Sequence, residues 1–85
     1  MDVDIFQKNR HDPLRVANLV KIEFFSAAKD GKQTIKDNFS AFSLNGVVSE
    51  VNFVGKSDTV TIRPELIESL HFFPHDEFDD LAQLS

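Results

Sequence analysis

The amino-acid sequence predicts a mainly β protein, a small five-stranded antiparallel barrel preceded by a short helix and followed by an acidic tail. Three observations predict this. Residues 47–73 alternate apolar and polar side chains in runs separated by turn residues, as half-buried strands do. Residues 19–26 alternate in the same way. Between these segments lie Asp30-Gly31 and Asn45-Gly46, dipeptides that are typical of tight turns.

Length and composition limit the possibilities. A chain of 85 residues has room for one domain with a small core. Nine phenylalanines are present, with no tryptophan and no tyrosine. Cysteine is absent, which excludes disulfides and thiolate chemistry and favours a reducing, cytoplasmic location. The sequence contains no signal-peptide pattern and no apolar run long enough for a membrane span.

The N-terminal part is expected to contribute little to the sheet. Residues 1–12 mix charges and predict a flexible segment ahead of a domain at residues 13–74. Asp12 and Pro13 suit the N-cap and first position of a helix, so a short helix is predicted to begin there; an extended lead-in is the alternative.

The first strand is predicted at residues 19–26, with Val20, Ile22 and Phe24 facing the core. Phe25 falls on the opposite face, where cover by the N-terminal segment is favoured over exposure to a partner. Residues 33–44 are ambiguous. We predict a second strand near residues 34–37, a break at Asn38, and a third strand from about Ser40 into the Asn45-Gly46 turn. A helix across residues 33–42 is the competing interpretation.

The last three elements are a strand at residues 47–54, a strand at residues 59–63 that Pro64 ends, and a closing strand after a one-turn connector. This ending is typical of SH3-like and Sm-like barrels. The predicted core consists of Val20, Ile22, Phe24, Phe42, Val51, Phe53, Val60, Ile62, Ile67, Leu70 and Phe72.

Charge is unevenly distributed along the chain. Residues 1–37 hold seven basic and six acidic residues, whereas residues 38–85 hold two basic and eight acidic ones. Phosphate backbones are bound by clustered Lys and Arg, so the second half disfavours direct nucleic-acid binding and favours a protein partner with a basic surface. The expected contact residues in the domain are exposed acids: Glu50, Asp58, Glu65 and Glu68.

The acidic tail, residues 75–85, is the second expected contact. Phe78, Leu81 and Leu84 recur at helical spacing, and such a segment can fold into a groove of a partner. A solubilising terminus is the alternative. The predicted partner-binding residues of the tail are Asp76, Glu77, Phe78, Asp79, Asp80, Leu81 and Leu84.

Catalysis and metal binding are not expected. The sequence has no nucleophile motif and no glycine-rich phosphate loop. His71, His75, Asp76 and Asp79 lack the spacing of a metal site, because Pro74 breaks any helix that would align the two histidines. The chain is therefore predicted to be non-enzymatic, with no cofactor.

Two segments resemble a known family. Lys29, Asp30 and Gly31 in the first turn, and residues 61–78 with Ile62, Ile67, Ser69 and Phe72, resemble the Rof family of small acidic inhibitors of the transcription terminator Rho. The resemblance covers about half of the chain. It implies an Sm-like fold and a role in blocking the RNA-binding site of Rho. The chain lacks the Cys- and Tyr-containing acidic start of that family.

The sequence therefore predicts a small acidic regulator or inhibitor that binds a basic surface of a partner protein. One alternative is a nucleic-acid-binding Sm-like subunit that uses the lysines of the first half: Lys21, Lys29, Lys32 and Lys36. A further alternative is a toxin-neutralising or host-factor inhibitor, which the sequence does not distinguish from the first.

Overall fold

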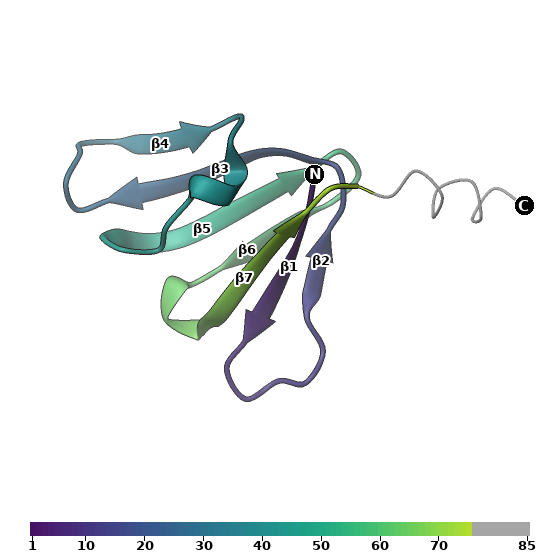
Figure 1. The fold of residues 1–85 in the computed structure, drawn as a ribbon. Helices are drawn as coiled ribbons and strands as arrows, with labels where there is room; N and C mark the ends of the chain where they lie inside the picture. The colour runs from purple at the N-terminus through teal and green to yellow at the C-terminus, as the bar shows by residue number, and fades with distance from the viewer. Residues whose placement is uncertain (76–85) are drawn as a thin grey trace, which may run out of the picture.

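The computed structural model describes residues 1–75, which form two antiparallel sheets (Figure 1). The elements follow in the order β1 (Asp2–Gln7), β2 (Leu14–Val16), β3 (Leu19–Ser26), β4 (Lys32–Ile35), the 3-10 helix η1 (Phe39–Ala41), β5 (Val47–Gly55), β6 (Thr59–Ile62), the 3-10 helix η2 (Pro64–Leu66) and β7 (Ile67–Phe73). The smaller sheet has the order β2-β1-β7 and the larger sheet β4-β3-β5-β6. A mainly β, antiparallel fold is confirmed. The closed five-stranded barrel is wrong, because seven strands divide between two sheets.

β1 is the centre of the smaller sheet, with antiparallel partners on both sides. Its Val3 and Ile5 are fully buried. The prediction that residues 1–12 form a flexible segment ahead of the domain is therefore wrong for residues 2–7. The strand alternates Val3 and Ile5 with Asp2 and Asp4, and these acids are paired with His75, beyond β7, and with Arg15 of β2.

The helix expected from Asp12 and Pro13 is also absent, and β2 lies there instead. Val16 is fully buried and pairs with Val3 across the sheet. A β-branched residue packs well on a pleated surface, so this pairing outweighs the local capping pattern. Asn18, with φ 52°, then turns the chain from β2 into β3.

The strands predicted at residues 19–26, 47–54 and 59–63 and the closing strand are confirmed as β3, β5, β6 and β7, and the connector after Arg63 is confirmed as η2. Two side chains of β3 differ from expectation. The register shifts between Leu19 and Lys21, which buries Leu19 and leaves Val20 50% exposed. Phe25 is exposed as well, so its expected cover by the N-terminal segment is wrong.

Residues 33–44 form a strand and a loop. β4 begins two residues before the predicted second strand. Asn38 has a left-handed backbone conformation (φ 52°) and forms the predicted break after this strand. η1 replaces the predicted third strand, and the competing helix is also absent. The backbone leaves the sheet because Phe39 is buried and Phe42 packs against Phe24 and Phe53. The Asn45-Gly46 turn forms, but it leads from this loop into β5.

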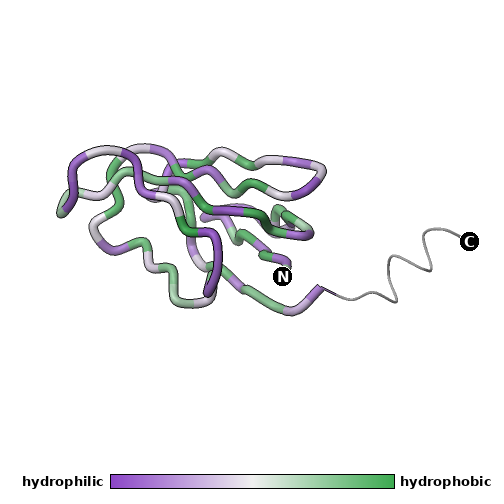
Figure 2. Tube along the Cα trace, turned by 90° about the horizontal axis from the view of Figure 1, so that it is seen from above, coloured by the Kyte–Doolittle hydropathy of each residue, from purple (hydrophilic) through white to green (hydrophobic). Residues whose placement is uncertain are grey.

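The core lies between the two sheets. Figure 2 shows how hydrophobic and hydrophilic residues alternate along the strands that enclose it. Of the predicted core residues, Ile22, Val51, Phe53, Ile62 and Ile67 are buried, and Phe24, Phe42, Val60, Leu70 and Phe72 pack against them half-buried. The remaining buried residues were not predicted: Val3, Ile5, Val16, Leu19 and Phe39.

The two sheets meet where β5 ends beside β2. A Cβ on Gly55 would lie 2.7 Å from the Ala17 carbonyl oxygen and 2.7 Å from Cγ1 of Val16. Glycine is required here because the two backbones approach so closely. Backbone hydrogen bonds from Lys56 to Asn18 (3.0 Å) and from Leu19 to Met1 (2.8 Å) fasten the same corner. Within residues 1–75, no helix is long and apolar enough to cross a membrane.

Candidate functional site

The four acids predicted in the domain are all exposed. Three of them surround the connection between β6 and β7. Glu50 adjoins Val51, which pairs with the last residue of β6; Glu65 lies in η2; and Glu68 is the second residue of β7. Asp58 lies in the turn at the opposite end of the β5–β6 hairpin. The structure therefore gathers three of the predicted residues and places the fourth apart.

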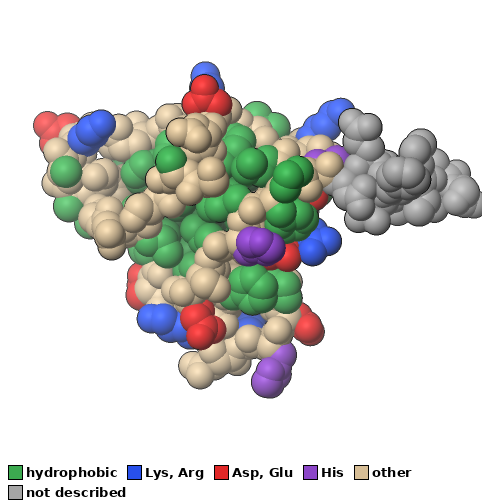
Figure 3. Space-filling model, viewed as in Figure 1, with side chains coloured by type: hydrophobic (Ala, Val, Ile, Leu, Met, Phe, Trp, Pro, Cys, Tyr) green, Lys and Arg blue, Asp and Glu red, His purple; other side chains and the backbone are tan. Residues whose placement is uncertain are grey.

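The lack of a charged partner distinguishes these exposed acids from the buried and half-buried ones. Asp2, Asp4 and Glu23 each have a cationic or imidazole partner within 4.0 Å. None of Glu50, Asp58, Glu65 and Glu68 has such a partner among residues 1–75. Figure 3 shows one face of the protein, with charged side chains mostly at its margins. The predicted acids are therefore available to an external cation.

The predicted contact residues of the tail lie outside the described residues, so that part of the hypothesis stays a prediction. Residues 1–75 hold nine basic and ten acidic residues. The net charge of this part is −1, since nine minus ten is −1, and residues 76–85 add four acids. Most of the excess negative charge of the chain is therefore carried by residues 76–85.

The lysines of the alternative hypothesis lie on or near the larger sheet. Nζ of Lys32 lies 3.0 Å from Oε2 of Glu23, and Nζ of Lys21 lies 3.7 Å from the same atom. The hydrogen bond from Lys32 is the main cause that lowers the pKa of Glu23, against a smaller opposing effect of burial. Lys29 lies in the β3–β4 turn and Lys36 follows β4. Two of the four lysines thus already neutralise an acid.

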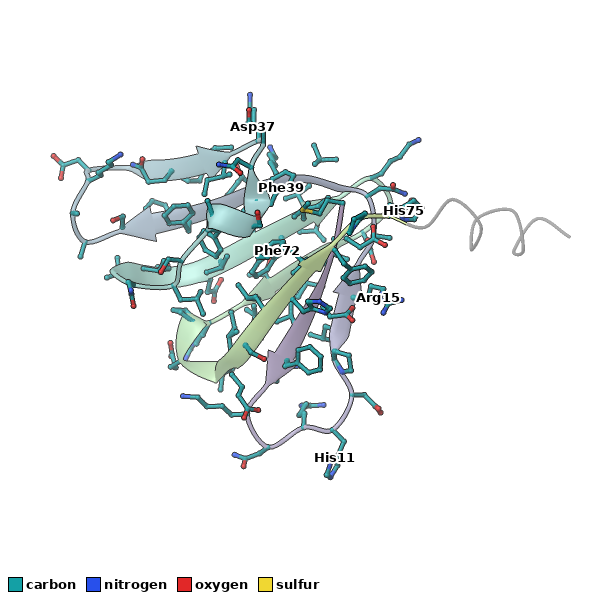
Figure 4. The ribbon with its side chains drawn as sticks, in the orientation of Figure 1. His11, Arg15, Asp37, Phe39, Phe72 and His75 are labelled. Carbon is teal, nitrogen blue, oxygen red and sulfur yellow. The ribbon has the colours of Figure 1, made fainter. Side chains whose placement is uncertain are left out.

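A cluster that the sequence did not predict lies on the outer face of the smaller sheet. Nε of Arg15 donates to Oδ1 of Asp4 at 2.7 Å, and its Nη2 donates to Oδ2 at 3.0 Å. The guanidinium also lies 5.0 Å from the centroid of the Phe73 ring. Nδ1 of His75 lies 2.9 Å from both carboxylate oxygens of Asp2. Figure 4 labels Arg15 and His75 beside the β1 strand.

Both carboxylates of this cluster are nearly buried, and their partners come from β2, from the turn after it and from the residue two positions beyond β7. The backbone N–H of Asn18 donates to Asp2 at 2.9 Å. The hydrogen bond from Arg15 is the largest cause that lowers the pKa of Asp4; burial opposes it, and the charges of Arg15 and His71 reinforce it. Two buried acids held in this way fasten β1 between the other two strands. The alternation of acids with Val3 and Ile5 was the available signal.

Metal binding finds no support in the described part of the chain, where no group of three or more His, Asp or Glu side chains is placed to hold an ion. His75 contacts Asp2, whereas His71 lies opposite Asp4 in the β1–β7 ladder. No family model matches the chain, and no curated protein or solved structure matches it either.

Proposed function

We propose that this protein is a non-enzymatic binding module of the cytoplasm, a small acidic regulator that occupies a basic surface of another protein. One observation carries the proposal. The buried and half-buried acids are paired, whereas Glu50, Glu65 and Glu68 are exposed around one connection and have no cationic partner among residues 1–75. A basic surface would supply the missing countercharges.

The tail adds to the same property. Its four acids within ten residues continue the chain beyond β7, and its apolar residues offer a partner a hydrophobic contact. Two contacts on one chain raise the effective affinity if the partner can engage both at once. The proposed interaction therefore combines the acids of the β6–β7 connection with residues 76–85.

A nucleic-acid-binding protein is the partner we favour, because its basic surface already suits a polyanion. The resemblance to the Rof family makes Rho the first protein to test. In this proposal the module competes with RNA for that surface. Charge complementarity predicts rapid association that slows as salt is added.

The test is the binding of purified Rho to immobilised protein at low and at physiological salt. Replacing both Glu65→Lys and Glu68→Lys should weaken binding about tenfold or more, since each reversal places like charges together. The matched control is Asp30→Lys with Asp37→Lys, which makes the same change of charge at exposed residues flanking β4, the edge strand opposite β6. The control should retain most of the affinity.

Two outcomes would overturn the proposal. If the Glu65 and Glu68 reversals bind as tightly as the wild type, the acids of this connection are not the contact. If the protein instead retains RNA in a gel-shift assay, and Lys29→Glu with Lys32→Glu abolishes that retention, the nucleic-acid-binding alternative is correct. Absence of binding to Rho would reject Rho, and the paired variants would then be compared against proteins retained from a cell lysate.

The contribution of the tail is tested separately. Deletion of residues 76–85 leaves His75 in place and should preserve the melting temperature while weakening partner binding. If the melting temperature falls and Phe78→Ala reproduces most of the loss, the tail instead packs against the domain. Unchanged melting together with unchanged affinity would remove the tail from the proposed contact.

A further inference from the structure

A pocket of about 240 Å³ lies between the β3–β4 hairpin and the loop that carries η1. Nine residues line it: Phe24, Ser26, Lys29, Gln33, Ile35, Ala41, Phe42, Ser43 and Asn45. The volume is below that of most sites for complete cofactors or drug-sized ligands. It suits one ring or one branched aliphatic group.

The pocket exists because the chain leaves the sheet after β4. Asn38 turns the backbone away, η1 follows, and the Asn45-Gly46 turn returns the chain to β5. Figure 1 shows this segment curving in front of the larger sheet. A regular strand at residues 40–44 would leave no such opening between the hairpin and the loop. Residues whose structure departs from their local pattern are frequent at functional sites.

One wall of the pocket is apolar and rigid. The Phe42 ring lies 5.1 Å from the Phe24 ring and 6.2 Å from the Phe53 ring, measured between centroids. Phe53 is fully buried, so Phe42 is anchored to the core while it also lines the pocket. Ile35 lines the pocket from β4 and is half-buried. An aromatic or branched group entering here would be desolvated against carbon atoms that are already fixed in position.

The rim of the pocket is polar and carries one positive charge. Lys29 is the only ionisable residue among the nine, and it forms no ion pair with any residue in the range 1–75. Nε2 of Gln33 donates to the carbonyl oxygens of Asp30 and Gly31 at 3.4 and 3.3 Å, which fixes the amide at the rim. Two serines and Asn45 complete the polar part.

We infer that this pocket binds a small carboxylate with an apolar body, such as an aryl-substituted or branched-chain acid. The carboxylate meets Lys29 and the hydroxyl groups, while the apolar body lies against Phe24, Ile35 and Phe42. No acid lines the pocket, so an ammonium group has no countercharge there. A phosphate with two negative charges would favour a cluster of cations or backbone N–H groups. A single lysine matches a single negative charge.

This inference is independent of the proposed function, since Lys29 and the pocket do not include the acids assigned to the partner. The same chemistry has two sources, a free carboxylic acid or the C-terminal residue of a peptide. Both present one carboxylate beside an apolar side chain. The probes below distinguish them.

The test is a titration of ¹⁵N-labelled protein with 3-phenylpropionate, followed by amide chemical shifts. Shifts should concentrate at residues 24–45, with a Kd on the order of 1 mM, as expected for a ligand of this size. The neutral 3-phenylpropionamide and the cationic 2-phenylethylamine should each bind more weakly, by about tenfold or more. A peptide that ends in phenylalanine is then compared with the free acid, and the tighter of the two identifies the source.

Lys29→Met is the critical variant, and Lys36→Met is its matched control because Lys36 is exposed and does not line the pocket. The first should weaken 3-phenylpropionate binding about tenfold, and the second should leave it unchanged. Equal binding of the acid, the amide and the amine would overturn the inference, as would retained affinity in Lys29→Met. Tighter binding of uridine monophosphate at the same amides would overturn it in favour of a nucleotide site.

Discussion

The smaller sheet closes its outer face with nearly buried charged pairs, whereas the larger sheet exposes hydrophobic side chains beside its Glu23 ion pairs. On the smaller sheet, Asp2 and Asp4 are nearly buried beneath His75 and Arg15. On the larger sheet, Phe25 and Val48 are direct partners in the β3–β5 ladder and are 43% and 47% exposed. The two sheets share one core but differ in what they offer to solvent.

This difference distinguishes residues that stabilise the fold from residues that are exposed to ligands or partners. Asp2 and Asp4 are each paired with a side chain from another segment, so changing either one leaves its partner without a counterpart. Changing Phe25 or Val48 removes little that is buried. Exposed side chains on the larger sheet can therefore be substituted to test contacts with ligands or partners without unfolding the protein.

The largest expected effect comes from the shared core. Phe53→Ala should cost about 3–5 kcal/mol of unfolding free energy, because Phe53 is fully buried and the change leaves a cavity. Phe25→Ala, on the open face of the adjacent strand, should cost less than about 1 kcal/mol. Urea denaturation of both variants measures the difference. Similar losses for the two would show that Phe25 is buried in solution.

The corner that joins the sheets should be the next most sensitive position. Gly55→Ala places a methyl group 2.7 Å from the backbone of Ala17 and should cost about 2–3 kcal/mol, as overpacking does. Gly31→Ala is the comparison, since its Cβ would enter open space and only its φ of +79° opposes the change. We expect about 1 kcal/mol there. Thermal denaturation can rank them, and a greater loss for Gly31→Ala would contradict the close approach at Gly55.

The charged pair of the smaller sheet should respond asymmetrically. Arg15→Met leaves the nearly buried Asp4 carboxylate without its main donor and should cost about 1–3 kcal/mol. Asp4→Asn should cost less, because the Arg15 side chain is 57% exposed and can be solvated by water. Chemical denaturation at neutral pH compares the two variants. Equal losses would contradict this asymmetry and would show that water does not replace the carboxylate as the partner of Arg15.

The smallest expected effect is a dependence of stability on pH. The pKa of Asp4 is lowered in the folded protein, chiefly by the hydrogen bond from Arg15, so the folded state favours the ionised form. This contribution to stability is complete above the unfolded-state pKa of about 4 and is lost as the pH falls below it. Asp4→Asn should therefore reduce the loss of stability between about pH 5 and pH 2. An unaltered pH profile would contradict this assignment; Asp12→Asn, at an exposed acid, serves as the control.

The C-terminal half of the fold could be predicted because its strands and turns are marked by residues close together in the sequence. Alternation and turn residues define β5 and β6, and Pro64 defines the end of β6. β1 carries the same alternation at Val3 and Ile5, but its pairing could not be predicted, since Asp2 pairs with Phe73 and no local pattern reveals a partner so distant in sequence. The shift that exposes Val20 is likewise a property of pairing between strands.

The candidate sites also differ in how much of each could be predicted from local sequence. Glu50 and Glu68 were predicted in strands and Glu65 in the connector, but their common position around η2 required the fold. The pocket beside Phe42 could not be predicted, because residues 40–44 satisfy a strand pattern and only the tertiary anchors Phe39 and Phe42 draw them off the sheet. Tertiary packing overrode a weak local preference.

The central position of β1 has a consequence for synthesis of the chain. β1 is synthesised before the other described strands, yet β7, its partner on one side, ends at Phe73. At typical elongation rates the first strand waits on the order of 10 s for that partner. Val3 and Ile5 are incompletely covered during this interval, so the smaller sheet is completed only after β7, the last described strand, has been made. Because the two ends of the described chain lie together, a circular permutant opened in the β3–β4 turn would make β7 and β1 neighbours in sequence and remove the delay.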